Sequence, residues 1–245
     1  MAPEQHFLRN RTQPNFRDFM KAVAGISMLS DHLGVFFYQE ITLLRVFGRI
    51  AAPLFFFIVG YSLSTKWSWK MFAWGTLLSI LSIGFLDGTF LNILFAFLLC
   101  RLLFRKWSPE ITPRWFLLAL TPLLLPSVIQ FSSTVLEYGT VGLAWAIAGR
   151  LVQQQSQEAI WWTILSSLSY FGWIVTNFDG FTEPNMMLIS GGECLLLMML
   201  SRAPFHPPVI PTPFSYLVLF LSRFSLQVYV YHLSFLMLLA MLFGN

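Results

Sequence analysis

The fold class follows from residues 43–64, which read LLRVFGRIAAPLFFFIVGYSLS. From Val46 onward this stretch is long and apolar enough to cross a bilayer as a helix, which takes about 20 residues. The chain of 245 residues has the same character, since 56% of them are hydrophobic and 11% are charged. Soluble domains carry roughly 25% charge, and a chain this short buries too little surface to hide so many apolar side chains. The sequence therefore predicts an integral membrane protein and excludes soluble, disordered and nucleic-acid-binding proteins.

Nine stretches qualify as spanning helices, so the expected fold class is an all-α, polytopic helical bundle in the membrane. They lie near residues 19–38, 46–65, 71–86, 90–105, 115–131, 135–152, 159–178, 185–200 and 224–243. Residues 214–222 are too short to span; we expect an interfacial or re-entrant piece, or an extension that makes a tenth element. No internal repeat is visible, so residues 19–245 are expected to form one domain after a basic segment at 1–18.

The positions of the basic residues predict the orientation of the chain, because cytoplasmic loops collect Lys and Arg. With the N-terminus in the cytoplasm, thirteen of the 15 Lys and Arg residues fall on that side. The other two, Arg45 and Arg49, fall on the outer side. Nine spans would then leave the C-terminus outside. Cys100 and Cys194 both lie in apolar runs, so neither a disulfide framework nor a metal site is expected.

Ionisable residues inside a span are costly, which makes each of them a functional candidate. Asp31 and His32 lie in the first expected helix, within MLSDHLG, and Arg45 and Arg49 share one face of the second. A short connection makes these helices a hairpin, so Asp31 and Arg49 are expected to form an ion pair. Consecutive helical residues point about 100° apart, so the partner of His32 is expected on another helix. His232 is the only other histidine inside an expected span.

Further polar side chains in or near the spans are candidates for holding a substrate. They are Arg45, Asn92, Glu137, Tyr138, Glu193, Tyr229 and Tyr231. A structural reading competes for several of them. Arg45 can snorkel to the outer interface, Asn92 can join helices by hydrogen bonds, and Glu137 can lie at the interface.

The motifs around these residues resemble the TraX family of membrane acetyltransferases. DHLG at 31–34 and GRIAAPLFFFIVGYSLS at 48–64 are similar to the family's D-H-apolar-G and G-R-x-A-aromatic-P-apolar-F patterns. LNILFAFLLC, EYGTVGL and VYVYHLSFL follow in the family's order, and the resemblance covers roughly residues 17–240. Ala52 departs from the pattern, because the family usually has an aromatic residue there.

The resemblance implies a membrane-embedded acyltransferase, expected in a bacterial inner membrane, that moves an acetyl group from acetyl-CoA to an amine or hydroxyl acceptor. It implies a general base or transient acyl carrier, for which His32 is suited because an imidazole takes and releases protons near neutral pH. Asp31, Arg49 and His232 are its expected catalytic partners. The acceptor is a peptide amine, a sugar or a lipid-linked group. The family's founding member is similar to an acetylase of F-type pilin, but that substrate is not carried over.

The expected site for the phosphates of coenzyme A is a basic group on the cytoplasmic side, formed by Arg101, Arg105 and Lys106. A second class of function stays open, because buried Asp, Glu, Arg and His also build proton-coupled transporters of small solutes. Such transporters often carry repeats. Binding of acetyl-CoA would separate the two classes.

Overall fold

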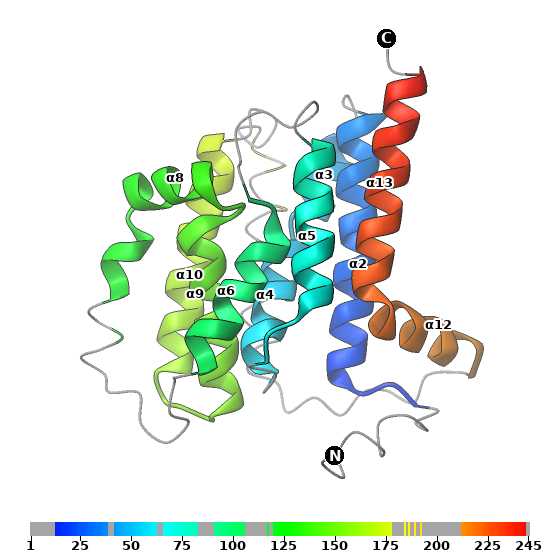
Figure 1. Ribbon diagram of the computed structural model, residues 1–245. Coiled ribbons are helices and arrows are strands. Elements are labelled where there is room, and N and C mark those ends of the chain that lie inside the picture. The colour runs from blue at the N-terminus through cyan, green and yellow to red at the C-terminus, as the bar shows by residue number, and fades with distance from the viewer. Residues whose placement is uncertain are drawn as a thin grey trace.

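The computed structural model describes residues 13–38, 42–62, 66–82, 91–105, 117, 120–177, 184, 186, 189, 192 and 212–243. These residues form helices, and no strand occurs among them apart from an isolated parallel bridge between Leu91 and Leu136. The longer helices stand side by side as an upright bundle, with α8 and α12 lying across it (Figure 1).

The elements have the following bounds. In chain order they are α2 (Phe16–Phe36), α3 (Thr42–Gly48), α4 (Ala51–Tyr61), α5 (Trp69–Ser82), α6 (Ile93–Arg105), the 3-10 helix η1 (Thr121–Leu124), α8 (Pro126–Val135), α9 (Gly139–Gln153), α10 (Ala159–Asn177), α12 (Thr212–Arg223) and α13 (Ser225–Phe243). Six of the expected spans coincide with α2, α5, α6, α9, α10 and α13 to within four residues at each end. The span expected at 185–200 lies almost wholly outside the described residues.

Two expected spans are broken. The stretch 46–65 is divided between α3 and α4, with Arg49 and Ile50 in the turn between them. The continuous helix expected over 115–131 is wrong, because η1 ends at Leu124 and α8 starts afresh at Pro126. Proline disfavours the helical conformation in the residue before it, and Leu125 is accordingly extended, with ψ 137°.

Two stretches are long and apolar enough to cross a membrane by length and composition, Thr42–Tyr61 and Ala159–Asn177. α12 and α13 would together make a third, bent by 77° at the break between them. Residues 214–222 therefore belong to a separate helix that does not continue the axis of the last one. The number of spans and the cytoplasmic N-terminus stay predictions.

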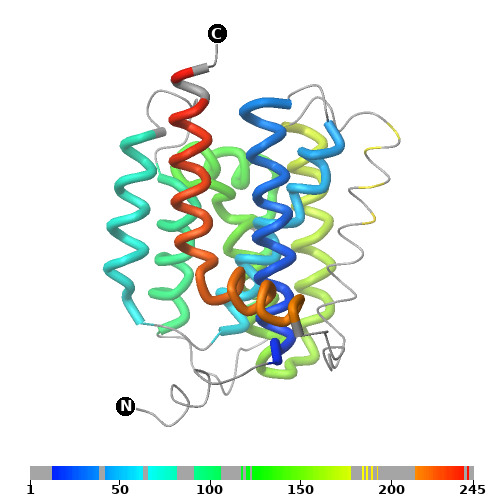
Figure 2. Tube along the Cα trace, turned by 90° about the vertical axis from the view of Figure 1, so that its right-hand side faces the viewer, coloured from blue at the N-terminus to red at the C-terminus, as the bar shows by residue number. Residues whose placement is uncertain are grey.

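α2 and α13 run side by side in the same direction, starting from the end of the bundle where α12 lies (Figures 1 and 2). α4 packs in the interior against α9. A Cβ atom at Gly60 of α4 would overlap the backbone carbonyl of Ala146 on α9, so this glycine lets the two backbones touch. Trp145, Phe56 and Leu54 fill the surrounding core, each 1% exposed.

Candidate functional site

A cavity of about 290 Å³ extends along α2 between α4, α5, α6 and α13. Asp31, His32, Glu137, Tyr138 and Tyr229 form part of its wall. The wall between this polar cluster and the other end of the bundle is mainly apolar. It includes Met28, Ala51, Ala52, Phe55, Ile58, Val59, Met71, Ile93, Leu94 and Phe97. Ala52, which departs from the family pattern, thus leaves room inside the cavity.

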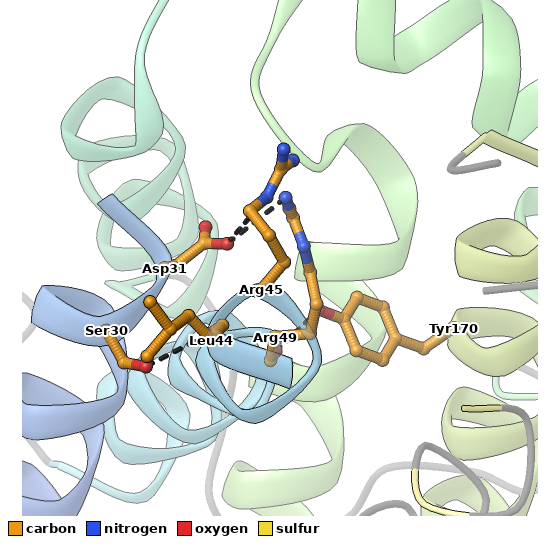
Figure 3. A network of polar contacts seen from close by, with 6 residues as sticks. All are labelled: Ser30, Asp31, Leu44, Arg45, Arg49 and Tyr170. Carbon is orange, nitrogen blue, oxygen red and sulfur yellow. Dashed lines mark hydrogen bonds and ion pairs between the residues drawn. The ribbon is translucent and has the colours of Figure 1, made fainter. Parts of the chain in front are cut away.

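Asp31 contacts two arginines, which approach its carboxylate from the same side (Figure 3). Its Oδ1 atom lies 3.3 Å from Nε of Arg45 and 3.3 Å from Nη2 of Arg49. Asp31 is 8% exposed and Arg49 is 6% exposed; buried charges of this kind require partners. The expected Asp31–Arg49 pair is present, and Arg45 joins it rather than standing alone at an interface.

Gly48 allows this cluster to form. A Cβ atom at Gly48 would overlap the Cβ atom of Asp31 and lie 2.6 Å from its Cα. Only a residue without a side chain therefore lets α3 approach α2 at Asp31. Next to this contact, the hydroxyl of Ser30 donates a hydrogen bond to the carbonyl oxygen of Leu44 at 3.0 Å, which joins the same two helices.

The break between α3 and α4 has a local cause in Pro53. A proline has no N–H, so it cannot donate to the carbonyl oxygen four residues earlier, which is that of Arg49. The hydroxyl of Tyr170, on α10, donates to this oxygen instead, at 2.7 Å in the interior. Tyr170 was not a candidate from the sequence, although the helical donor that Pro53 takes away is a signal that another donor is needed nearby.

His32 and His232 contact each other directly, 200 residues apart in the sequence. Nδ1 of His32 lies 2.6 Å from Nε2 of His232, whose own Nδ1 lies 2.5 Å from the carbonyl oxygen of Val228. A carbonyl oxygen only accepts, so Nδ1 of His232 carries the hydrogen, and the Nε2 of a neutral His232 is an acceptor. His32 then donates from Nδ1. By this assignment from the hydrogen-bond pattern, Nε2 of His32 has a free lone pair.

Glu137 and Tyr138 connect the start of α9 to this cluster. Oε2 of Glu137 accepts a hydrogen bond from the backbone N–H of Ile93 at 2.8 Å and so caps the N-terminus of α6. Tyr138 has a φ of 64°, a left-handed conformation that costs a non-glycine residue about 1–3 kcal/mol. This strained backbone places the Tyr138 side chain on the cavity wall.

The structure separates the remaining candidates into two groups. Tyr229 lies on the wall, with its ring centroid 6.1 Å from that of His32. Tyr231 is 61% exposed and packs against Trp74, so it does not join the cavity. Asn92 uses its amide to bind the Gly75 carbonyl at 2.7 Å and the Ser79 hydroxyl at 3.2 Å, and its oxygen accepts from a backbone N–H. Asn92 therefore joins α5 to α6.

Of the three expected phosphate ligands, Arg101 lies on the cavity wall. Arg105 is exposed and is not part of the wall. Lys106 and Glu193 lie outside the described residues. Lys21 and Lys70 do line the cavity, although their positions in the sequence indicated only the charge of the cytoplasmic face.

Comparison with known proteins identifies a family and a relative of this chain. The family model described as TraX protein matches residues 16–240. An uncharacterized protein of Rickettsia prowazekii (strain Madrid E) is 30% identical over 148 residues, which are 60% of this chain and 59% of that protein. The chain thus spans less than two thirds of that relative's length. No solved structure matches.

Proposed function

The chain belongs to the TraX family, whose model matches residues 16–240, and from this premise we propose that it is a membrane-embedded acetyltransferase. It transfers an acetyl group from acetyl-CoA to an amine or hydroxyl acceptor at or across a bacterial inner membrane. One observation carries the proposal: His32 lies on the wall of the cavity, and its Nδ1 atom is hydrogen-bonded to His232. Its other ring nitrogen, Nε2, is therefore the one that can act as the base.

In this reaction His32 is the general base. As the acceptor attacks the thioester carbonyl, its N–H or O–H proton passes to Nε2 of His32, and a tetrahedral intermediate forms. The intermediate then expels the thiolate of coenzyme A, which takes the proton from His32. The bond to the acceptor forms, the C–S bond breaks, and the base returns to its starting state. Such a base contributes about 10²–10⁴-fold to the rate.

His232 orients the base and shares its charge. When Nε2 of His32 takes the proton, the hydrogen on Nδ1 lies in a 2.6 Å contact with Nε2 of His232. His232 is held in turn by the carbonyl oxygen of Val228. An orienting partner behind a catalytic histidine fixes both its ring and its tautomer. We assign His232 this positioning role.

The neighbouring groups divide the remaining tasks. Tyr229 and Tyr138 are on the cavity wall, so their hydroxyls are our choice for donors to the oxygen that becomes negative in the intermediate. Arg49 and Arg45 bind Asp31 and so hold the end of α2 that carries His32. Glu137, which caps α6 from the cavity wall, is our candidate for holding the acceptor.

The test is incubation of the purified protein, in lipid nanodiscs, with acetyl-CoA labelled on the acetyl group and an extract of bacterial membranes. We expect label to appear in material other than acetyl-CoA and free acetate. The alternative, a proton-coupled transporter of small solutes, predicts neither transfer nor binding of acetyl-CoA. If labelled acetyl-CoA neither binds nor reacts, the proposed function is wrong.

A further inference from the structure

Three cationic side chains from three helices converge on one end of the cavity. Lys21 comes from the first turns of α2, Lys70 from the start of α5 and Arg101 from the last turns of α6. All three side chains line the same cavity. Like charges that face one hollow repel each other, and an anion in that hollow removes the repulsion.

One carboxylate lies close to this group, that of Asp18, three residues before Lys21 on α2. Its Oδ1 accepts a hydrogen bond from the hydroxyl of Ser222 at 2.5 Å and its Oδ2 accepts one from the backbone N–H of Asn15 at 3.0 Å. These donors are neutral, so Asp18 keeps its charge, but one carboxylate beside three cations leaves an excess of positive charge among the described residues at this end of the cavity.

The Nε atom of Arg101 is a second, independent indication of a ligand. This atom is buried and has no hydrogen-bond partner in the part of the chain that the structure describes. A buried donor without a partner is unfavourable, and more so when the group is charged. A phosphate oxygen would supply the missing acceptor, and arginine is suited to phosphate by its fixed fork of N–H groups.

The depth of the cavity agrees with the length of the proposed donor. Lys21 and His32 are 11 residues apart on α2, which corresponds to about 16 Å along the helix axis. About 13 bonds join the sulfur of coenzyme A to its nearest phosphorus, the length of some four extended residues, or roughly 15 Å. A thioester at His32 thus places its phosphates near Lys21. The apolar wall between the two ends suits the uncharged arm.

We infer that Lys21, Lys70 and Arg101 form the binding site for the phosphates of acetyl-CoA, at the mouth of the cavity. This inference rests on the proposed function, and it adds Lys21 and Lys70 while omitting Arg105, which is not on the cavity wall. With the N-terminus in the cytoplasm, the mouth faces the side on which acetyl-CoA occurs.

The test measures the affinity of purified protein for coenzyme A and for pantetheine, which has the arm without the phosphates. The variants are Lys21→Gln, Lys70→Gln and Arg101→Gln. We expect each to bind coenzyme A roughly 10-fold more weakly or worse, since each loses one charge-assisted contact, while affinity for pantetheine stays unchanged. Lys66→Gln is the matched control, because Lys66 is exposed, precedes Lys70 by four residues and is not on the cavity wall.

Lys70→Arg and Arg101→Lys keep the charge and are expected to bind coenzyme A more tightly than the glutamine variants, which separates loss of charge from misfolding. The inference is overturned if the three glutamine variants bind coenzyme A as tightly as Lys66→Gln does, or if wild-type protein does not bind it. Failure of the proposed function alone has another signature: coenzyme A binds through the three cations, but no acetyl transfer occurs.

Discussion

Tyr170→Phe removes a single hydroxyl and isolates the contribution of the helix break to stability. Tyr170 is 2% exposed, and its hydroxyl donates to the Arg49 carbonyl at 2.7 Å. Pro53 cannot replace it as a donor. The variant takes a hydrogen-bond donor away from a buried carbonyl oxygen, which costs about 1–3 kcal/mol. Phe keeps the ring, whose centroid lies 6.0 Å from that of Trp173, so loss of packing adds little.

The assay is the free energy of unfolding in mixtures of mild detergent and denaturant, followed by tryptophan fluorescence. Tyr216→Phe is the matched control, since this tyrosine is 60% exposed, and we expect its effect to lie within about 0.5 kcal/mol of zero. Pro53→Ala supplies an N–H that can bond to the Arg49 carbonyl. In that background, Tyr170→Phe should cost at least about 1 kcal/mol less than in wild type.

Two results would refute this reasoning about Tyr170. One is a cost for Tyr170→Phe no larger than that of Tyr216→Phe. The other is an equal cost with and without Pro53, because the hydroxyl would then stabilise the protein in some way unrelated to the missing helical donor.

Three further substitutions test the cluster and the cavity. Gly48→Ala should destabilise the protein by about 1–3 kcal/mol, because the methyl group meets Asp31; Gly25→Ala, with open space at its Cβ position, should not, and equal unfolding energies would contradict the account. Asp31→Asn removes the carboxylate that contacts two arginines and should cost about 3 kcal/mol; a cost below 1 kcal/mol would mean that the ion pairs do not stabilise the fold. Ala51→Phe narrows the cavity and should weaken acetyl-CoA binding more than tenfold in equilibrium titrations, so unchanged affinity would place the donor elsewhere.

The helices that the sequence predicted well are those whose signal is local. α10 and α13 coincide with apolar runs at 159–178 and 224–243 to within one residue at each end, because a hydrophobic run by itself favours a spanning helix. The breaks near Pro53 and Pro126 have equally local causes. Mean hydropathy is averaged over a window as long as a span, however, so a single proline hardly changes its value and the break is not predicted.

The polar cluster was predictable where two helices are close in sequence. Asp31 and Arg49 belong to one hairpin, so their depth follows from residue counting, and their ion pair is present. His232 was singled out as the other histidine in a span, and it contacts His32.

Tyr170, Lys21 and Lys70 were not foreseen as site residues, because their importance depends on tertiary contacts. A tyrosine in an apolar run has no distinctive sequence signal. Basic residues near the ends of spans indicate above all the orientation of the chain in the membrane. Only the packing of α2, α5 and α6 shows that Lys21 and Lys70 line the same cavity.

The most direct test of the central claim compares acetyl transfer by wild-type protein and His32→Ala at saturating labelled acetyl-CoA. Leu33→Ala is the control, because Leu33 is adjacent in the chain, 38% exposed and not on the cavity wall. The account predicts that His32→Ala binds coenzyme A normally but transfers acetyl groups about 10²–10⁴-fold more slowly, while Leu33→Ala stays near the wild-type rate. Transfer by His32→Ala at the rate of Leu33→Ala would contradict it.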